Sequence, residues 1–531
     1  MTRGEAWTRR QLLGAVGPVA VLANEQKGSQ RGGSAALVRA FDPSGSPASN
    51  DRLSTLLLVN PNSRPFEVLS TPKGDGTATI EMPKEKFDLA MVLPVRDFGT
   101  VYLHADNAGA GYSAAQVSGR ELVLNYEFAR SRAGLVRRYV KSAQAEGVSF
   151  SSGVMSRLEQ GEAALARATA ARETGARVGH SNDSLAETMW AGEMAAIERA
   201  RHRIARQGPR PGFLFGAAAF GYAKSDEYAR QYGALLNYGT VPFYRAATER
   251  VEGSPDYRNV DAILEKMAGT QIITKGHPLV WFHRAGISEF LKTKSWDELK
   301  RSCREYILRS VGRFRSRIHA WDVINEAHDW ANELGFNQDQ LLEITRLAAE
   351  STRVADPTAF RVVNCCLPWG EYVATGRTYA GPLKRPARTP LEYYRAVEDA
   401  RVPYEAVGIQ VYYPGQDMLE MERQLERFFV FGKPIHITEL GVPSSSEGVK
   451  GGGALPYENV WHGTAWSEQI QADWAEQFYT ICYSKPEIQA ISWWTFSDSS
   501  ERGGSGLMRS GFRPKLSYQR LAKLLASWKE G

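Results

Sequence analysis

Short hydrophobic segments rich in β-branched and aromatic residues alternate with helix-length amphipathic stretches from about residue 210 to the C-terminus. Eight segments have this character: Phe213–Ala217, Asn237–Val241, Gln271–Lys275, Ile318–Ile324, Phe360–Val363, Ala406–Val411, Ile435–Thr438 and Ile491–Phe496. Strands that alternate with helices pair in parallel, and eight such units close into a barrel. We therefore predict an α/β fold with a TIM (β/α)8 barrel over residues 208–531, whose reacting groups lie at the C-terminal strand ends.

The chain of 531 residues is longer than one barrel, which takes roughly 250 residues or somewhat more. Residues 37–130 alternate short apolar runs with turn sequences, which predicts a small β-sandwich-like accessory domain. Residues 131–207 are rich in Ala, Arg and Glu at helical spacing, which predicts a helical connecting segment. Residues 24–36 are polar and rich in Gly and Ser, and we predict a linker there.

The accessory domain could bind sugar or serve the structure. Sugar platforms need exposed flat aromatic rings, and the chain has no tryptophan between Trp7 and Trp190. Tyr102, Tyr112 and Tyr126 could form such a platform, but tyrosines of this kind lie more often in a core. The sequence favours a structural role and leaves carbohydrate binding as the alternative.

Residues 1–23 have the pattern of an export signal. Arg9 and Arg10 precede a short apolar stretch that ends in small residues at Ala23. The arginine pair resembles a twin-arginine signal, and an ordinary secretory leader is the alternative. We predict a secreted or periplasmic protein.

The composition narrows the classes of partner and cofactor. The formal charge is only +6, and the barrel half has no long basic run, so we expect no nucleic-acid binding. No apolar run reaches the roughly 18 residues that span a bilayer. The cysteines Cys303, Cys365, Cys366 and Cys482 match no metal motif and are expected to be buried thiols, with a Cys303–Cys482 disulfide as the alternative. No nucleotide or zinc-helix motif occurs in a supporting context, so we predict neither a metal site nor a cofactor.

Two glutamates each close a hydrophobic strand. Glu326 follows the fourth predicted strand and Glu439 the seventh, and these strands lie across the barrel from each other. Cleavage of a glycosidic bond needs one carboxyl that protonates the leaving oxygen and a second that attacks or stabilises the oxocarbenium-like carbon. Asn325 strengthens this interpretation, because an amide there can hydrogen-bond a sugar 2-hydroxyl.

Further motifs stand in order along the barrel region. They are Gly276–Trp281, Trp321–Glu326, Gly408–Gln410, Ile437–Leu440, Trp493–Asp498 and Pro514–Tyr518. Together they resemble the motifs of glycoside hydrolase family 10, the xylanase family of clan A, over about residues 210–525. The resemblance implies a retaining enzyme with Glu326 as acid/base and Glu439 as nucleophile, acting on a xylan-like plant cell-wall polysaccharide.

The resemblance also implies contacts with the sugar in the −1 subsite. Asn325 would bind its 2-hydroxyl, and His277 would contact the same sugar. Trp281 would form part of the wall around this sugar, and Trp494 would stack on it. Gln410 would lie beside the nucleophile.

Asn364 matches the asparagine that opens the family's strand-5 motif. Tyr412 stands where the family usually has a histidine that orients the nucleophile. A phenol can donate to a carboxylate, but it carries no positive charge at neutral pH. Gly441 replaces the aspartate that commonly follows the nucleophile motif, so we expect a different electrostatic field at Glu439.

The chain also departs from the family after strands 2 and 3. The family's Glu-Asn pair with Lys and Trp, which grips the −2 xylose, is absent from Thr240–Ala246. Arg245 or Arg250 could substitute for it. Phe282 replaces a histidine, although His283 is adjacent.

Pro443–Trp466 is a long segment after strand 7 with three consecutive glycines, followed by Tyr457, Trp461, His462 and Trp466. It could move over the site and stack on sugars, or its aromatic residues could anchor it.

Three functions therefore remain open. The first is an endo-β-1,4-xylanase. The second is a clan-A β-glycosidase with another glycan or an exo mode, which the altered strand 2 favours. The third is a non-catalytic carbohydrate-binding protein, against which Asn325 and the two glutamates argue. The oligomeric state is not predicted.

Overall fold

The computed structural model describes residues 35–60, 70–328, 331–366, 368, 370, 372–373, 376–378, 381–383, 387–412, 415–446, 460–498 and 504–530. The predicted export signal, residues 1–23, lies outside the described residues. The predicted linker, residues 24–36, does so as well, except for Ala35 and Ala36, which begin the first strand.

Eight parallel strands close into a barrel, as predicted. They are β8 (Leu214–Ala218), β9 (Tyr238–Pro242), β10 (Ile273–His277), β11 (Ala320–Asn325), β12 (Phe360–Cys365), β15 (Ala406–Tyr412), β16 (Ile435–Gly441) and β19 (Ile488–Trp493). Neighbours around the barrel follow chain order, and β19 closes onto β8. Each predicted strand overlaps one of these, so the TIM barrel is confirmed.

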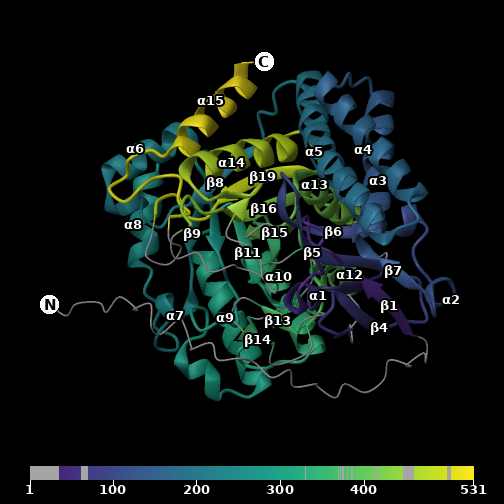
Figure 1. Ribbon diagram of the computed structural model, residues 1–531. Coiled ribbons are helices and arrows are strands. Elements are labelled where there is room, and N and C mark those ends of the chain that lie inside the picture. The colour runs from purple at the N-terminus through teal and green to yellow at the C-terminus, as the bar shows by residue number, and fades with distance from the viewer. Residues whose placement is uncertain are drawn as a thin grey trace.

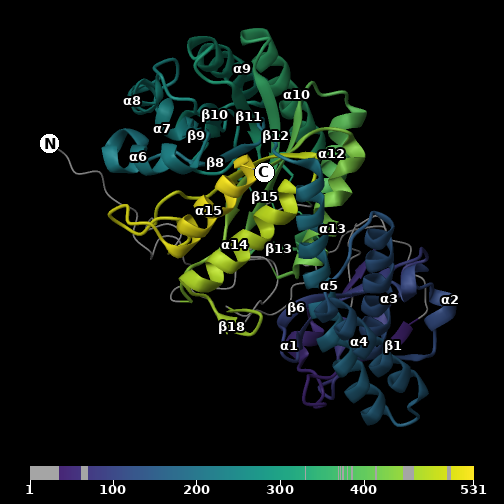
Figure 2. The same cartoon turned by 90° about the horizontal axis from the view of Figure 1, so that it is seen from above.

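Helices surround the barrel (Figure 2). The longer ones are α6 (Asp226–Leu235), α8 (Arg258–Met267), α9 (Trp296–Arg313), α10 (Gln338–Ala355), α12 (Pro390–Asp399), α13 (Met418–Glu426), α14 (Glu468–Tyr483) and α15 (Leu516–Glu530). Several begin with a reciprocal cap, such as Ser295 with Glu298 on α9 and Thr389 with Glu392 on α12. Such caps satisfy backbone N–H groups that a helix leaves without a partner at its start.

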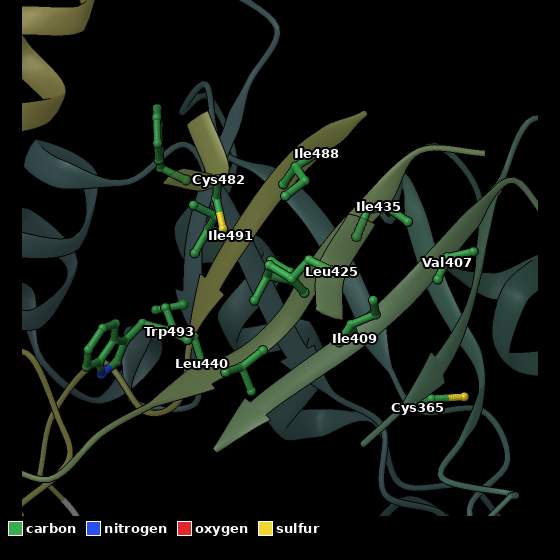
Figure 3. Close-up of a cluster of buried hydrophobic side chains, with 14 of the residues drawn as sticks. Cys365, Val407, Ile409, Leu425, Ile435, Leu440, Cys482, Ile488, Ile491 and Trp493 are labelled. Atoms are coloured by element: carbon green, nitrogen blue, oxygen red, sulfur yellow. The ribbon is translucent and has the colours of Figure 1, made fainter. Parts of the chain in front are cut away.

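Apolar side chains fill the space between the strands and the helices. Figure 3 shows part of this core, with Val407, Ile409, Ile435, Leu440, Ile488, Ile491 and Trp493 from neighbouring strands and Leu425 and Cys482 from α13 and α14. Successive side chains of a strand point to opposite faces. Because Leu440 packs in this core, Glu439 beside it is directed to the other face of the strand.

The N-terminal part begins with two small sheets (Figure 1). One has the order β3-β4-β1-β7 and the other β2-β5-β6. Their bounds are β1 (Ala35–Arg39), β2 (Leu57–Val59), β3 (Ser70–Pro72), β4 (Thr77–Glu81), β5 (Asp88–Val95), β6 (Gly99–Ala105) and β7 (Glu121–Val123). Three long helices follow: α3 (Leu124–Ala145), α4 (Ser152–Ala170) and α5 (Thr174–Gln207).

The helical part begins earlier than predicted and is not a separate connector. Helix α3 begins at Leu124, so the predicted boundary between residues 130 and 131 falls inside it. Leu124 and Phe128 of α3 and Met189 of α5 belong to the same buried cluster as the strand residue Val38. The sheets and helices therefore share one core, and we call residues 35–207 the N-terminal module.

All four cysteines are buried free thiols, so the alternative Cys303–Cys482 disulfide is not formed. In the described part of the chain, no helix is both long enough and apolar enough to span a membrane.

Candidate active site at the C-terminal end of the barrel

Glu439 lies within β16, and Glu326 directly follows β11. Both are nearly buried, with 4% and 6% of their surface exposed. Glu326 has a φ of 54°, in the left-handed region that residues other than glycine rarely adopt. Its backbone N–H donates to the Asn364 carbonyl at 2.8 Å, which holds the turn in place. Strained residues of this kind persist where their surroundings fix them and cluster at active sites.

The Glu439 carboxylate has polar neighbours on three strands. The Tyr412 hydroxyl donates to Oε2 at 2.6 Å. The Asn364 amide donates to Oε1 at 3.4 Å, and Nε2 of His277 lies 3.6 Å from the same oxygen. These contacts come from three different strands and fix the orientation of the carboxylate.

The indole of Trp281 holds the Glu326 carboxyl. Nε1 of Trp281 donates to its Oε2 at 2.9 Å. The Trp281 ring packs against Tyr244 and His283, with ring centroids 5.8 Å and 4.3 Å away. Trp281 therefore orients Glu326 and is itself supported by neighbouring rings.

Asn364 connects the two halves of the site. Its backbone carbonyl accepts from the Glu326 backbone N–H. Its side-chain NH₂ group donates to Glu439 and, at 2.8 Å, to Oδ1 of Asn325. Gln410 donates to the same Asn325 oxygen at 3.0 Å. Because Oδ1 of Asn325 already accepts two hydrogen bonds, the orientation of this side chain is fixed, and its NH₂ group is the part that can donate to a substrate. The structure thus brings both predicted glutamates and the three predicted amides into one network.

His277 is fixed by a buried ion pair. Its Nδ1 lies 2.6 Å from Oδ2 of Asp322, and Nζ of Lys275 lies 2.8 Å from the same oxygen. Burial alone would raise the pKa of the Asp322 carboxyl, but Lys275 and His277 outweigh burial and hold this pKa below its ordinary value. Because an ionised carboxylate can only accept, Nδ1 of His277 carries a hydrogen, and Nε2 faces Glu439.

An aromatic wall stands beside these polar groups. Trp494 and Tyr244 both present their rings at steep angles to His277, with centroids 5.2 Å and 5.8 Å away. Phe220 packs edge-on against Trp494 at 5.2 Å and against Tyr244 at 6.0 Å. Sequence reasoning missed Phe220 and Tyr244, because single aromatic residues in loops carry no motif.

Tyr412 and Gly441 form one feature. They are neighbours in the register of β15 and β16. A Cβ atom at residue 441 would lie 2.7 Å from the Trp494 carbonyl and 3.2 Å from the Tyr412 ring. The space beside residue 441 is therefore taken up by the Trp494 backbone and the Tyr412 ring, so a larger residue there would have to displace one of them.

The other departures have separate outcomes. Arg245 is buried and bound to Glu249 and Ser302, so it does not substitute for the missing strand-2 groups; Arg250 is exposed. Burial lowers the pKa of His283 to about 4, which keeps its ring neutral at physiological pH.

The aromatic residues after β16 serve as anchors. Trp461 and Trp466 are buried, and His462 is bound by the N-terminal module. The three glycines at residues 451–453 and Tyr457 lie outside the described residues.

The alternative of a sugar platform formed by the tyrosines of the N-terminal module finds no support in their positions. Tyr102 and Tyr112 are buried, and the Tyr126 hydroxyl forms a hydrogen bond with Thr169. Among the residues that the structure describes, no cluster of His, Cys, Asp or Glu has the arrangement of a metal site.

Known proteins resemble this chain in sequence. Endo-1,4-beta-xylanase B of Thermotoga neapolitana is 24% identical over 237 residues, which cover 43% of this chain and 60% of that protein. Endo-1,4-beta-xylanase B of Paenibacillus barcinonensis is 27% identical over 201 residues, covering 35% and 55%. The chain thus spans little more than half the length of these relatives.

Among solved structures, native xylanase 10B from Thermotoga maritima superposes with a TM-score of 0.46 and 20% identity, over 62% of this chain and 98% of that one. The sequence model of glycosyl hydrolase family 10 matches residues 244–521. That match covers more than half of the chain, so this protein belongs to glycosyl hydrolase family 10.

Proposed function

We propose that this protein is a retaining endo-β-1,4-glycanase that acts on a xylan-like polysaccharide. The observation that carries the proposal is Asn364, whose backbone carbonyl accepts from the Glu326 backbone N–H and whose side-chain amide donates to the Glu439 carboxylate. Family membership and the xylanase relatives support the same substrate class.

In the proposed reaction, Glu439 attacks the anomeric carbon while Glu326 protonates the leaving glycosidic oxygen. The aglycone departs, and the glycone remains bound to Glu439 as an ester. Glu326, now ionised, takes a proton from water, which attacks the anomeric carbon and releases Glu439. Asn325 donates to the sugar 2-hydroxyl, a contact that strengthens in the transition state.

The positions of the supporting side chains suit these roles. Trp281 orients the Glu326 carboxyl, and Tyr412 and Asn364 hold the Glu439 carboxylate in place for attack. Orientation of this kind supplies a large part of enzymatic rate enhancement. The reacting groups have already lost their translational and rotational entropy on binding, so the chemical step does not have to overcome that loss.

A second candidate is a β-glycosidase with another glycan or an exo mode. Two observations favour it. Phe220 and Tyr244 place an aromatic wall beside His277. Thr240–Ala246 lacks the polar residues with which the family binds the −2 sugar. An apolar wall stacks on a sugar face but forms few hydrogen bonds with its hydroxyls.

Glu326→Gln and Glu439→Gln test the proposed chemistry. Each is expected to lower kcat on aryl glycosides by roughly 10²–10⁴-fold, since each removes an acid/base or a nucleophilic group. The substrates are xylan, mixed-linkage glucan, mannan and aryl glycosides, and proton NMR follows the anomeric configuration of the first product.

Retention with a ladder of xylo-oligosaccharides supports the endo-xylanase. Release of single sugars supports the exo mode. Wild-type rates in both variants would rule out the roles of the two glutamates, and a wild type inactive on every β-glycan would favour the carbohydrate-binding alternative.

Export is a separate proposal that depends on residues 1–23, where Arg9-Arg10 precedes an apolar stretch. It suits an enzyme whose polymeric substrate lies outside the cell. Changing both arginines to lysine is expected to retain the protein in the cytoplasm if the twin-arginine route is used, whereas export through the secretory route would continue.

A further inference from the structure

The N-terminal module contacts the barrel at the connections that follow β15 and β16, the two strands that carry Tyr412 and Glu439. Figures 1 and 2 both show β6 and α5 beside α13, which follows β15. The hairpin of β17 (Val460–Trp461) and β18 (Thr464–Ala465), which belongs to the connection after β16, also lies against β6.

The first contact is a buried ion pair. Arg132 of α3 binds Asp417 with two hydrogen bonds, of 2.8 Å and 3.1 Å. Asp417 in turn caps the start of α13, where its side chain accepts from the backbone of Leu419 and Glu420. A buried ion pair is costly to break, because the remaining partner keeps a charge without compensation. Two residues earlier, the Gly415 carbonyl accepts from the backbone of Tyr102 at 3.0 Å.

The second contact is centred on Glu193 of α5, which is 2% exposed. One carboxylate oxygen accepts from the Met418 backbone at 3.1 Å, and the other lies 2.5 Å from Nε2 of His462. Nδ1 of His462 faces the Phe98 carbonyl at 3.3 Å, and its ring packs against Phe98 and Trp190. One side chain of the module therefore joins the connection after β15 to the connection after β16.

These anchors lie close to the reacting groups along the chain. Gly415 is three residues from Tyr412, a reach of at most about 11 Å even for a fully extended chain. Tyr412 donates to the Glu439 carboxylate at 2.6 Å. The anchors on residues 415–418 therefore lie close to the end of β15 that carries Tyr412.

We propose that the N-terminal module is a positioning element of the active site. Through Glu193 and Arg132 it fixes the connection after β15, and with it the Tyr412 hydroxyl that orients Glu439. This inference rests on the proposed function for its kinetic consequences, but its structural part holds whatever the substrate. It assigns residues 35–207 a role in the chemistry of the barrel rather than in sugar binding.

Glu193→Gln in the full chain is the principal test. A carboxamide has the same size as a carboxylate but only one acceptor oxygen, whereas Met418 N–H and His462 both require acceptors. The matched control is Glu127→Gln, since Glu127 is also buried in the module but binds only Tyr112 and Arg130, both within the module. Asp417→Asn, which keeps the helix cap and removes one charge of the ion pair, is a second test variant.

Three measurements separate positioning from plain stabilisation. The first is kcat and KM on an aryl glycoside, well below the melting temperature. The second is the rate at which a 2-deoxy-2-fluoro glycoside labels Glu439 covalently. The third is amide hydrogen exchange of peptides covering residues 406–418 and 435–446, which needs no substrate.

We expect Glu193→Gln and Asp417→Asn to lower kcat and the labelling rate by about ten- to a hundredfold, with KM nearly unchanged, because misplacement of a catalytic group by an ångström has an effect of this size. Exchange should accelerate in both peptides. Glu127→Gln should lower only the melting temperature.

The proposal is overturned if Glu193→Gln and Asp417→Asn retain wild-type kcat, labelling rate and hydrogen exchange while losing stability as the control does. If the wild type hydrolyses no β-glycoside and is not labelled by the 2-deoxy-2-fluoro glycoside, the proposed function is refuted instead. In that case the hydrogen-exchange comparison still decides whether the module holds these two connections.

Discussion

The Tyr412 phenol donates to Glu439 from a position where family 10 usually has a histidine, and Gly441 leaves room for its ring. A phenol does not change its charge between pH 5 and 8, whereas a histidine does. The proposed nucleophile, Glu439, therefore accepts from a phenol where the family usually places a histidine.

Tyr412→Phe tests this contact. Loss of a hydrogen bond to a charged group costs about 1.5–3 kcal/mol, so kcat/KM on an aryl glycoside should fall roughly ten- to a hundredfold. Tyr404→Phe is the matched control, because the Tyr404 hydroxyl also donates to a carboxylate, that of Glu398, just before β15 begins. If both variants lose activity equally, the effect of Tyr412 is not specific to the nucleophile.

Much of the site could be predicted because the reacting groups of a parallel barrel converge at the strand ends. Asn325 ends β11, Glu326 directly follows it, and Gln410 lies two residues before the end of β15; each belongs to the network. The suggestion that Arg245 substitutes for the missing strand-2 groups was wrong, and the sequence contained a feature that argued against it. Glu249 lies four residues later on the same short helical turn, and the two form a buried ion pair.

At the level of elements, the barrel strands were predictable because each is a short apolar run bounded by turns. The start of α3 was not, because its N-cap is Val123, whose side chain forms no capping hydrogen bond. A helix that begins without Ser, Thr, Asp or Asn leaves no start signal in the sequence. Its first turn, at Leu124, is held by packing against the sheets instead.

Strands β10 and β11 pack so closely at Gly276 that residue 276 has no room for a side chain. Gly276 is paired in register with Trp321, and a Cβ atom at residue 276 would lie 2.3 Å from the indole ring. Gly276→Ala should therefore destabilise the protein by about 1–3 kcal/mol in denaturant unfolding. Gly233→Ala in α6 is the control, because its Cβ would meet nothing within 4 Å and should stabilise the helix slightly. Equal unfolding midpoints for the two variants would contradict the packing argument.

For the whole molecule, buried histidines make stability depend on pH. Burial lowers the pKa of His328 to about 4 and that of His436 to about 3, from an ordinary value of 6.5. Below pH 6.5 the unfolded chain binds protons that the folded protein does not, so stability should fall as the pH drops from about 6.5 toward 4. Each residue contributes up to about 1.4 kcal/mol per pH unit.

Urea unfolding at several pH values between 7 and 4 measures this slope. His328→Asn should reduce the slope, because it removes one of the two buried histidines with a lowered pKa. A slope that is the same in the wild type and the variant would show that other groups govern acid unfolding.

Helix α5 belongs to two cores at once. Leu185, Ala186 and Met189 pack with the sheets of the module, and Ala191, Ala195 and Ile197, further along the same helix, pack with the barrel. Neither half can lose its packing without exposing part of this helix. Calorimetry should therefore record one cooperative melting peak for the whole protein, and exchanging the module for one from an unrelated enzyme should yield a chain that does not fold.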